Sequence, residues 1–271
     1  MPELPEVETT RRGIEPHLRG RRVTDVRVHD RRLRWPVTPG LETALKGQRV
    51  QAVQRRAKYL LLRFKPGTLI MHLGMSGNLR VLPNGTALLK HDHLELQLDS
   101  KFVLRLNDPR RFGSALYTTD DPARHPLLRE LAPEPLEPGF DGAYLHRITR
   151  RRRVAIKPLL LNGRLITGVG NIYASEALFR ARIRPRRAAH SLTLAECTRL
   201  AAAIRRVLSA AIRVGGTTLR DYVGADGDPG YFRQKLFVYE RAGLACRRCR
   251  TSVRQVTQGQ RSTYFCPRCQ K

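Results

Sequence analysis

The stretch His93-Leu94-Glu95-Leu96-Gln97-Leu98 indicates how the first half of the chain folds. Its leucines stand at every second position, so an extended strand places all of them on one face. Similar short runs flank this stretch, at residues 59–64, 68–73, 78–82 and 102–106. Turn signals such as Pro66-Gly67 separate them. Many short strands between such turns, over about 22–118, predict a two-layered antiparallel β-sandwich.

Helical periodicity replaces this alternation on both sides. Residues 4–18 have apolar positions at steps of three or four, with a proline suited to the first turn, and predict a helix that ends at Gly20. After a proline-rich connection at 122–138, helices are predicted at 141–152, 155–161, 171–183 and 193–214. The glycine-rich residues 216–232 read as a loop, and the tail 237–271 as short strands around a metal. The fold class is therefore α+β.

Four cysteines near the end of the sequence form two Cys-x-x-Cys pairs separated by sixteen residues, Cys246 with Cys249 and Cys266 with Cys269. Two turns that each bring two thiolates to one ion are typical of a four-cysteine zinc site. Because protein fills all four positions, the expected cofactor is one structural Zn²⁺. The fifth cysteine, Cys197, is expected to fill space in a helix.

The charge balance favours a polyanionic partner. The 271 residues include 51 Lys and Arg against 23 Asp and Glu, a formal net charge of +28. Nucleic acid is the leading candidate, because each neutralised phosphate releases condensed counterions. Charge alone leaves open an enzyme, a ribosomal or architectural protein, or an arginine-rich genome. No run approaches the ~20 apolar residues of a membrane span, and no secretory signal is visible, so we expect no membrane and a cytoplasmic location.

The amino terminus, Met1-Pro2-Glu3-Leu4-Pro5, has two interpretations. Removal of Met1 would leave Pro2 as a free secondary amine, and an α-amino group titrates near ~8, below a lysine. Such an amine can attack a sugar C1′ and form an iminium ion, with Glu3 as general acid or base. The alternative is ordinary helix entry, with proline and acids in the first turn.

Five ordered motifs make the chain resemble the bacterial formamidopyrimidine-DNA glycosylases. They are the start PELPEVET (2–9), AKYL around Lys58, HLGMSG (72–77), DPRRFG (108–113) and GVGNIY (168–173), followed by the four cysteines. The resemblance covers essentially the whole chain. It implies an N-terminal catalytic β-sandwich domain (1–131), a helix–two-turns–helix DNA-binding domain with a lesion-recognition loop (132–236) and a zinc finger (237–271).

The resemblance also implies the chemistry. A bifunctional DNA glycosylase/AP lyase of base excision repair would remove 8-oxoguanine and formamidopyrimidines from duplex DNA and then cleave the strand by β,δ-elimination. Pro2 would be the Schiff-base nucleophile, with Glu3, Lys58 and Arg261 completing the catalytic set. The partner would be double-stranded DNA containing an oxidised purine or an abasic site, bound by a monomer at the bacterial nucleoid.

Roles in DNA binding follow from the same resemblance. Because C1′ is inaccessible inside a stacked duplex, the damaged nucleotide must be extruded. Met75, Arg110 and Phe112 match the residues that fill the resulting gap, and apolar side chains wedged between base steps stabilise such a distortion. Their glycine neighbours favour exposed turns over the alternative of core positions.

Phosphate contacts are implied for Lys58, His72, Asn171 and Arg261, with Lys157 assisting. Any one of them alone would read as an ordinary surface residue. The family often has an acid and a glutamine after the leucine run that follows Lys157, whereas this chain has Asn162-Gly163-Arg164, which favours a turn.

Two rival functions remain. A glycosylase for oxidised pyrimidines of the same superfamily would have similar chemistry, but its members usually have Gly in place of Leu4 and lack the Arg-x-Phe wedge. A non-catalytic zinc-finger DNA-binding protein would share the charge and the cysteines, yet would not need Pro2 or Glu3.

Overall fold

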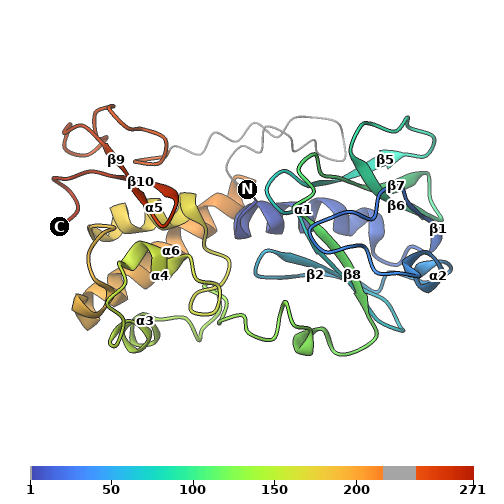
Figure 1. The fold of residues 1–271 in the computed structure, drawn as a ribbon, viewed down its shortest axis with the longest axis horizontal. Coiled ribbons are helices and arrows are strands. Elements are labelled where there is room, and N and C mark those ends of the chain that lie inside the picture. The colour runs from blue at the N-terminus through green and yellow to red at the C-terminus, as the bar shows by residue number, and fades with distance from the viewer. Residues whose placement is uncertain (1, 216–235) are drawn as a thin grey trace. The chain divides into compact units, whose positions relative to one another are not determined.

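The structure is a computed structural model that describes residues 2–215 and 236–271 (Figure 1). They fall into two compact units: residues 2–129 with Gly215 form the first, and residues 130–214 with 236–271 form the second. The loop predicted at 216–232 lies outside the described residues. In the part of the chain that the structure describes, no helix is both long and apolar enough to cross a membrane.

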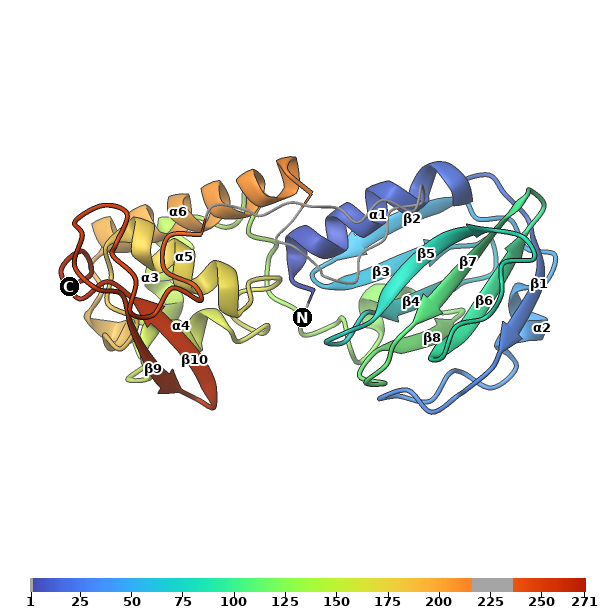
Figure 2. The same ribbon diagram turned by 90° about the horizontal axis from the view of Figure 1, so that it is seen from above.

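Two four-stranded antiparallel sheets form the first unit, as the alternation of leucines predicts (Figure 2). One sheet has the order β1-β6-β7-β5 and the other the order β2-β3-β4-β8. The strands are β1 (Val23–Val28), β2 (Ala52–Arg56), β3 (Tyr59–Arg63), β4 (Thr68–His72), β5 (Asn78–Pro83), β6 (Asp92–Leu98), β7 (Phe102–Asn107) and β8 (Ser114–Thr118). Leu94, Leu96 and Leu98 of β6 are all buried in one core with leucines of β3 and β7.

Helix α1 (Leu4–Leu18) packs against β2, β3 and β5. Val7, Ile14 and Leu18 lie on its buried face and join the sandwich core, which is the helical period read from the sequence. This packing fixes the amino-terminal end of α1, and therefore Pro2 and Glu3, on the rigid first unit. A short helix α2 (Leu41–Leu45) and a 3₁₀ turn η1 (Pro122–Arg124) complete the unit.

The second unit is helical, with α3 (Gly142–Thr149), α4 (Ile156–Leu160), α5 (Asn171–Ala181) and α6 (Leu194–Arg213), a 3₁₀ turn η2 (Ala189–Ser191) and a hairpin of β9 (Arg254–Gln258) and β10 (Arg261–Phe265). Helices α3 and α5 both pack on α6. Gly142 allows the close approach of α3, because a Cβ there would lie 2.2 Å from Thr198 Oγ1. Cys197 is buried in α6, as expected.

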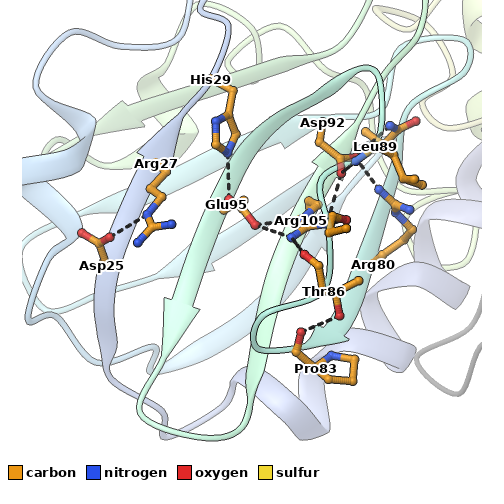
Figure 3. Close-up of polar contacts among 12 residues, drawn as sticks. Asp25, Arg27, His29, Arg80, Pro83, Thr86, Leu89, Asp92, Glu95 and Arg105 are labelled. Carbon is orange, nitrogen blue, oxygen red and sulfur yellow. Dashed lines mark hydrogen bonds and ion pairs between the residues drawn. The ribbon is translucent and has the colours of Figure 1, made fainter.

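A buried network of charged side chains lies on the β1-β6-β7-β5 sheet (Figure 3). Arg80 and Arg105 are direct partners on β5 and β7, where like charges repel. Asp92 pairs with both of them, and Glu95 receives Arg105 Nη2 at 2.6 Å and His29 Nε2 at 2.7 Å. The network therefore pairs both arginines with carboxylates inside the sheet.

The carboxylate of Glu95 contributes to stability in a pH-dependent way. Burial acts to raise its pKa, but hydrogen bonds from His29 and Arg105 outweigh burial, so the pKa lies below the usual 4.5. A folded pKa below the unfolded one means that this contribution is complete above about pH 4.5 and is lost as the pH falls through the folded value.

We expect Arg105→Met to lower the free energy of unfolding by about 3–5 kcal/mol, because it leaves two buried carboxylates without their shared cation. Urea denaturation measures the change. The matched control is Arg27→Met, whose ion pair with Asp25 on the same sheet is exposed and should contribute ~0–1 kcal/mol. Equal effects of the two substitutions would contradict the assignment of the buried network.

Candidate functional site

The amino-terminal residues of the first unit bring Pro2 and two carboxylates together. Pro2 is buried and directly precedes Glu3, the N-cap of α1. Glu3 and Glu6 are 1% and 2% exposed, and a Glu6 carboxylate oxygen accepts the backbone N–H of Glu3 at 2.9 Å. Helix entry and the catalytic interpretation are therefore compatible, because the same cap that starts α1 also holds acids beside Pro2.

Lys58 and His72 lie at neighbouring ends of paired strands. Lys58 belongs to the two-residue turn that joins β2 to β3, and Tyr59 beside it pairs with His72 at the end of β4. The rings of Tyr59 and His72 are 4.8 Å apart. The register of β3 and β4 thus places these two predicted phosphate contacts at the same edge of the sandwich.

His72 is held in its neutral form. Its Nδ1 accepts the backbone N–H of Gly74 at 2.9 Å, which leaves the proton of the neutral ring on Nε2. Burial, together with the charges of Lys58 and Arg34, lowers the pKa of His72 to about 4. At neutral pH the side chain is an uncharged hydrogen-bond donor, suited to a phosphate oxygen without contributing a full charge.

Met75 and Phe112 occupy two turns that touch each other. Each side chain is 41% exposed, so neither belongs to the core. The guanidinium of Arg110 lies 5.0 Å from the centroid of the Phe112 ring. Gly74 permits the contact between the turns, because a Cβ there would lie 2.4 Å from the backbone carbon of Phe112. The three predicted gap-filling residues are therefore brought together on one surface.

Asp108 links the same two turns through hydrogen bonds. It is fully buried and accepts hydrogen bonds from Ser76 Oγ at 2.8 Å and from the backbone N–H of Gly113 at 2.7 Å. Ser76 Oγ in turn accepts the backbone N–H of Arg110 at 3.3 Å. One buried carboxylate thus fixes the relative position of the turns, a role that the sequence motif alone did not reveal.

Ser76→Ala should destabilise the protein by about 1.5–3 kcal/mol, because it removes a hydrogen bond to a buried carboxylate. It should also weaken binding to damaged duplex by loosening the two turns. Urea denaturation and DNA titration measure these effects, with Ser100→Ala in the β6–β7 turn as control. Wild-type stability in Ser76→Ala would rule out the hydrogen bond from Ser76 to Asp108 as a link between the two turns.

Backbone strain lies beside several of these side chains. Ala57, Arg111 and Gln260 have φ values of 55°, 56° and 59°, in the left-handed region. That region costs a non-glycine residue about 1–2 kcal/mol. Each of the three directly adjoins a predicted site residue: Lys58, Arg110 or Arg261. Such strain is typical of positions where the surrounding fold holds a functional turn in place.

The second unit holds the remaining predicted residues around the β9–β10 hairpin. Asn171 opens α5 and donates from Nδ2 to the carbonyl oxygen of Ser262 at 3.0 Å. Arg261 is exposed at the start of β10. Lys157, which was predicted as a DNA contact, is 1% exposed, and its ammonium donates to Ser262 and Thr263 of β10. Sequence motifs alone could not indicate these contacts, because Ser262 lies 105 residues from Lys157 in the chain.

The four predicted zinc ligands meet at one point. Their sulfur atoms all lie within 4.8 Å of one another, with 3.9 Å between Cys246 and Cys269 and 3.4 Å between Cys249 and Cys266. Tetrahedral coordination at ~2.3 Å would separate the sulfurs by about 3.8 Å. The donor set and its spacing therefore fit one structural Zn²⁺.

Glu176 is a buried residue that the sequence interpretation missed. Its Oε1 accepts backbone N–H groups of Phe237, Val238 and Tyr239 at 2.9–3.0 Å from α5. These hydrogen bonds hold in place the residues 237–239, which lead into the zinc finger. A carboxylate on an otherwise apolar helical face was the available signal.

The chain matches three family models. Residues 1–115 match the formamidopyrimidine-DNA glycosylase N-terminal domain, residues 131–223 the H2TH domain of the same enzymes, and residues 243–271 a zinc finger found in FPG and IleRS.

Known proteins resemble the whole chain. The formamidopyrimidine-DNA glycosylase of Thioalkalivibrio sulfidiphilus is 60% identical over 100% of both chains. The MutM (FPG) protein of Thermus thermophilus is 41% identical, with a TM-score of 0.88 over 99% of this chain and 98% of that one. Lactococcus lactis Fpg, solved with DNA containing an abasic site, is 32% identical with a TM-score of 0.92 over both full chains. Other structures of that protein hold DNA containing Fapy-dG or an oxidised pyrimidine.

A β-sandwich with a capped amino-terminal helix, a helical unit and a four-cysteine finger define a DNA glycosylase/AP lyase. The chain belongs to the formamidopyrimidine-DNA glycosylase family.

Proposed function

We propose that Pro2 is the nucleophile with which this enzyme removes oxidised purines from duplex DNA and then cleaves the strand. The observation that carries the proposal is the burial of Pro2 beside Glu3 and Glu6 at the start of α1. The positive end of the α1 dipole disfavours a protonated amine at this position. It therefore favours the unprotonated form that can attack carbon.

The reaction begins when the lone pair of the Pro2 nitrogen, freed by removal of Met1, attacks C1′ of the damaged nucleotide. The bond from C1′ to the base breaks and the base leaves with a proton. Opening of the sugar ring, with its oxygen protonated by Glu3, gives an iminium ion between Pro2 and C1′.

The iminium ion then withdraws electrons from C2′. Loss of a C2′ proton expels the 3′ phosphate by β-elimination, and a second elimination expels the 5′ phosphate. Water releases the sugar fragment from Pro2. Lys58 and Arg261 complete the catalytic set by binding the phosphates that leave.

The proposed DNA contacts would hold the damaged nucleotide in place for this chemistry. Lys58, the neutral His72, Asn171 and Arg261 bind phosphates around the extruded nucleotide, and each offers N–H donors suited to phosphate oxygens. Met75, Phe112 and Arg110 fill the gap in the duplex. The exposure of the two apolar side chains and their rigid turns favour this role over a core role.

The substrate is double-stranded DNA that contains 8-oxoguanine, a formamidopyrimidine or an abasic site. The enzyme acts on it as a monomer in the bacterial cytoplasm. We retain the three-part division into a catalytic domain (1–131), a helix–two-turns–helix domain (132–236) and a zinc finger (237–271). Leu4 and the Arg110–Phe112 pair favour purines, although the Lactococcus lactis relative was also solved with an oxidised pyrimidine.

Borohydride trapping tests the proposal. The reagent reduces an iminium ion to a stable amine, so wild-type enzyme should form a covalent adduct with damaged duplex. We expect faster trapping with 8-oxoguanine than with oxidised thymine. The reverse order would support the pyrimidine enzyme, and lesion binding without any adduct would support a non-catalytic zinc-finger protein.

A further inference from the structure

Lys157 is among the largest fully buried side chains of the described residues. Its Nζ donates to the carbonyl oxygen of Ser262 at 2.9 Å and to Thr263 Oγ1 at 2.8 Å. A buried ammonium is costly unless it is paired and hydrogen-bonded, so these contacts account for where the side chain lies. Its charge is directed at the β9–β10 hairpin.

The same part of the hairpin receives two further hydrogen bonds. Asn171 donates to the carbonyl oxygen of Ser262 at 3.0 Å. Lys157 of α4 and Asn171 of α5 therefore hold the same carbonyl group. Thr263 Oγ1 donates in turn to the carbonyl oxygen of Arg261 at 3.5 Å. A chain of hydrogen bonds thus leads from the Lys157 ammonium to the backbone of Arg261.

The hairpin itself gives Arg261 a fixed direction. Gly259 and Gln260 have φ values of 52° and 59°, and the two flanking residues, Gln258 and Arg261, are paired. Positive φ at both central residues is the pattern of a tight type I′ turn. Lys157 and Arg261 also line one small hollow of about 130 Å³. Movement of residues 262–263 would therefore move Arg261.

We propose that Lys157 is a positioning residue that holds the β9–β10 hairpin so that Arg261 meets a DNA phosphate, and that Lys157 does not contact DNA. The part played by Arg261 rests on the function proposed above. The position of the hairpin in DNA-free enzyme does not rest on that function. The position of the hairpin and the part played by Arg261 are therefore tested separately.

Hydrogen exchange tests the positioning in DNA-free enzyme. Lys157→Met removes the ammonium and keeps the length of an apolar side chain. It should speed amide exchange in residues 259–265 severalfold, while zinc content stays at one ion. Thr263→Val, which removes one acceptor, should give a smaller change of the same kind and serves if Lys157→Met does not fold. Unchanged exchange in both variants would overturn the proposal.

A double-mutant cycle tests whether Lys157 acts through Arg261. The probe is duplex containing a tetrahydrofuran abasic-site analogue, titrated at several salt concentrations. Arg261→Ala should weaken binding roughly tenfold and lower the salt slope by about 0.9. Lys157→Met should act in the same direction. The double variant should bind like Arg261→Ala alone, because the lysine has nothing left to position.

Additive effects of Lys157→Met and Arg261→Ala on binding would contradict the proposal. A direct phosphate contact by Lys157 would lower the salt slope by about a further 0.9 in the Arg261→Ala background, which would overturn the proposal. Lys58→Met combined with Lys157→Met is the control, since these residues belong to different units and their effects should add. If wild-type enzyme fails to form a borohydride adduct, the proposed chemistry fails while the exchange and binding results still decide the role of Lys157.

Discussion

Pro2→Gly and Glu3→Gln should each reduce base excision by about 10²–10⁴-fold, the usual contribution of a positioned acid–base or nucleophilic group. Glu3→Gln keeps the shape of the N-cap while removing the carboxylate that transfers the proton. Pro2→Gly replaces a rigid secondary amine by a flexible primary one. Single-turnover excision of 8-oxoguanine measures both effects.

Binding separates a catalytic defect from a folding defect. Affinity for duplex with a tetrahydrofuran site should stay within a few-fold of wild type in both variants, because the DNA-contacting residues are unchanged. Glu15→Gln, on the half-exposed side of the same helix, is the matched control and should retain full excision. Wild-type excision by Glu3→Gln would exclude Glu3 from the proton transfer.

Removal of Met1 is the condition on which the nucleophile depends. Mass spectrometry of the purified protein should give a chain that begins at Pro2. If the protein retains Met1 and still cleaves abasic DNA at the full rate, Pro2 is not the nucleophile.

Zinc removal should have the second large effect. A structural zinc contributes about 10–16 kcal/mol to folding of its domain, so chelation or Cys249→Ser should unfold the finger. We expect DNA affinity to fall by about 100-fold or more, because the β9–β10 hairpin loses its shape. DNA titration and measured zinc content report the change.

The first unit should survive this treatment. Its core is made from α1 and the two sheets, and contains none of the zinc ligands. The borohydride adduct should therefore still form at saturating DNA. Cys197→Ala, which changes the buried cysteine of α6, should leave both zinc content and DNA affinity unchanged. Loss of adduct at saturating DNA in the zinc-free enzyme would show that the finger is needed for formation of the iminium ion itself, and not only for binding the phosphates through Arg261.

Local patterns predicted the elements well where one face of an element is apolar. The alternation in 93–98 and the period of 4–18 correspond to β6 and α1. The strands β1, β2 and β8 were not singled out individually, because none of them alternates strictly between apolar and polar residues, and the helix α2 is only five residues long. Helix α4 ends at Leu160, before the Asn162-Gly163 turn that departs from the family pattern.

The candidate site was predicted one motif at a time. The motifs named Met75 and Phe112 but gave no sign that Asp108 would hold their two turns together. They also assigned His72 to phosphate without indicating that it is neutral. Lys157 shows the same limit most clearly, because only its surroundings reveal that its charge is directed at Ser262 and Thr263.

The amino-acid sequence by itself determined the zinc ligands, the proline and glutamate at the start of α1 and the family, because residue type and spacing carry that information along the chain. Tertiary structure alone decided which polar side chains remain available to DNA and which are consumed inside the protein. The physical reason is that hydrogen-bond partners such as Lys157 and Ser262 lie 105 residues apart, so burial and pairing arise only when the chain is folded.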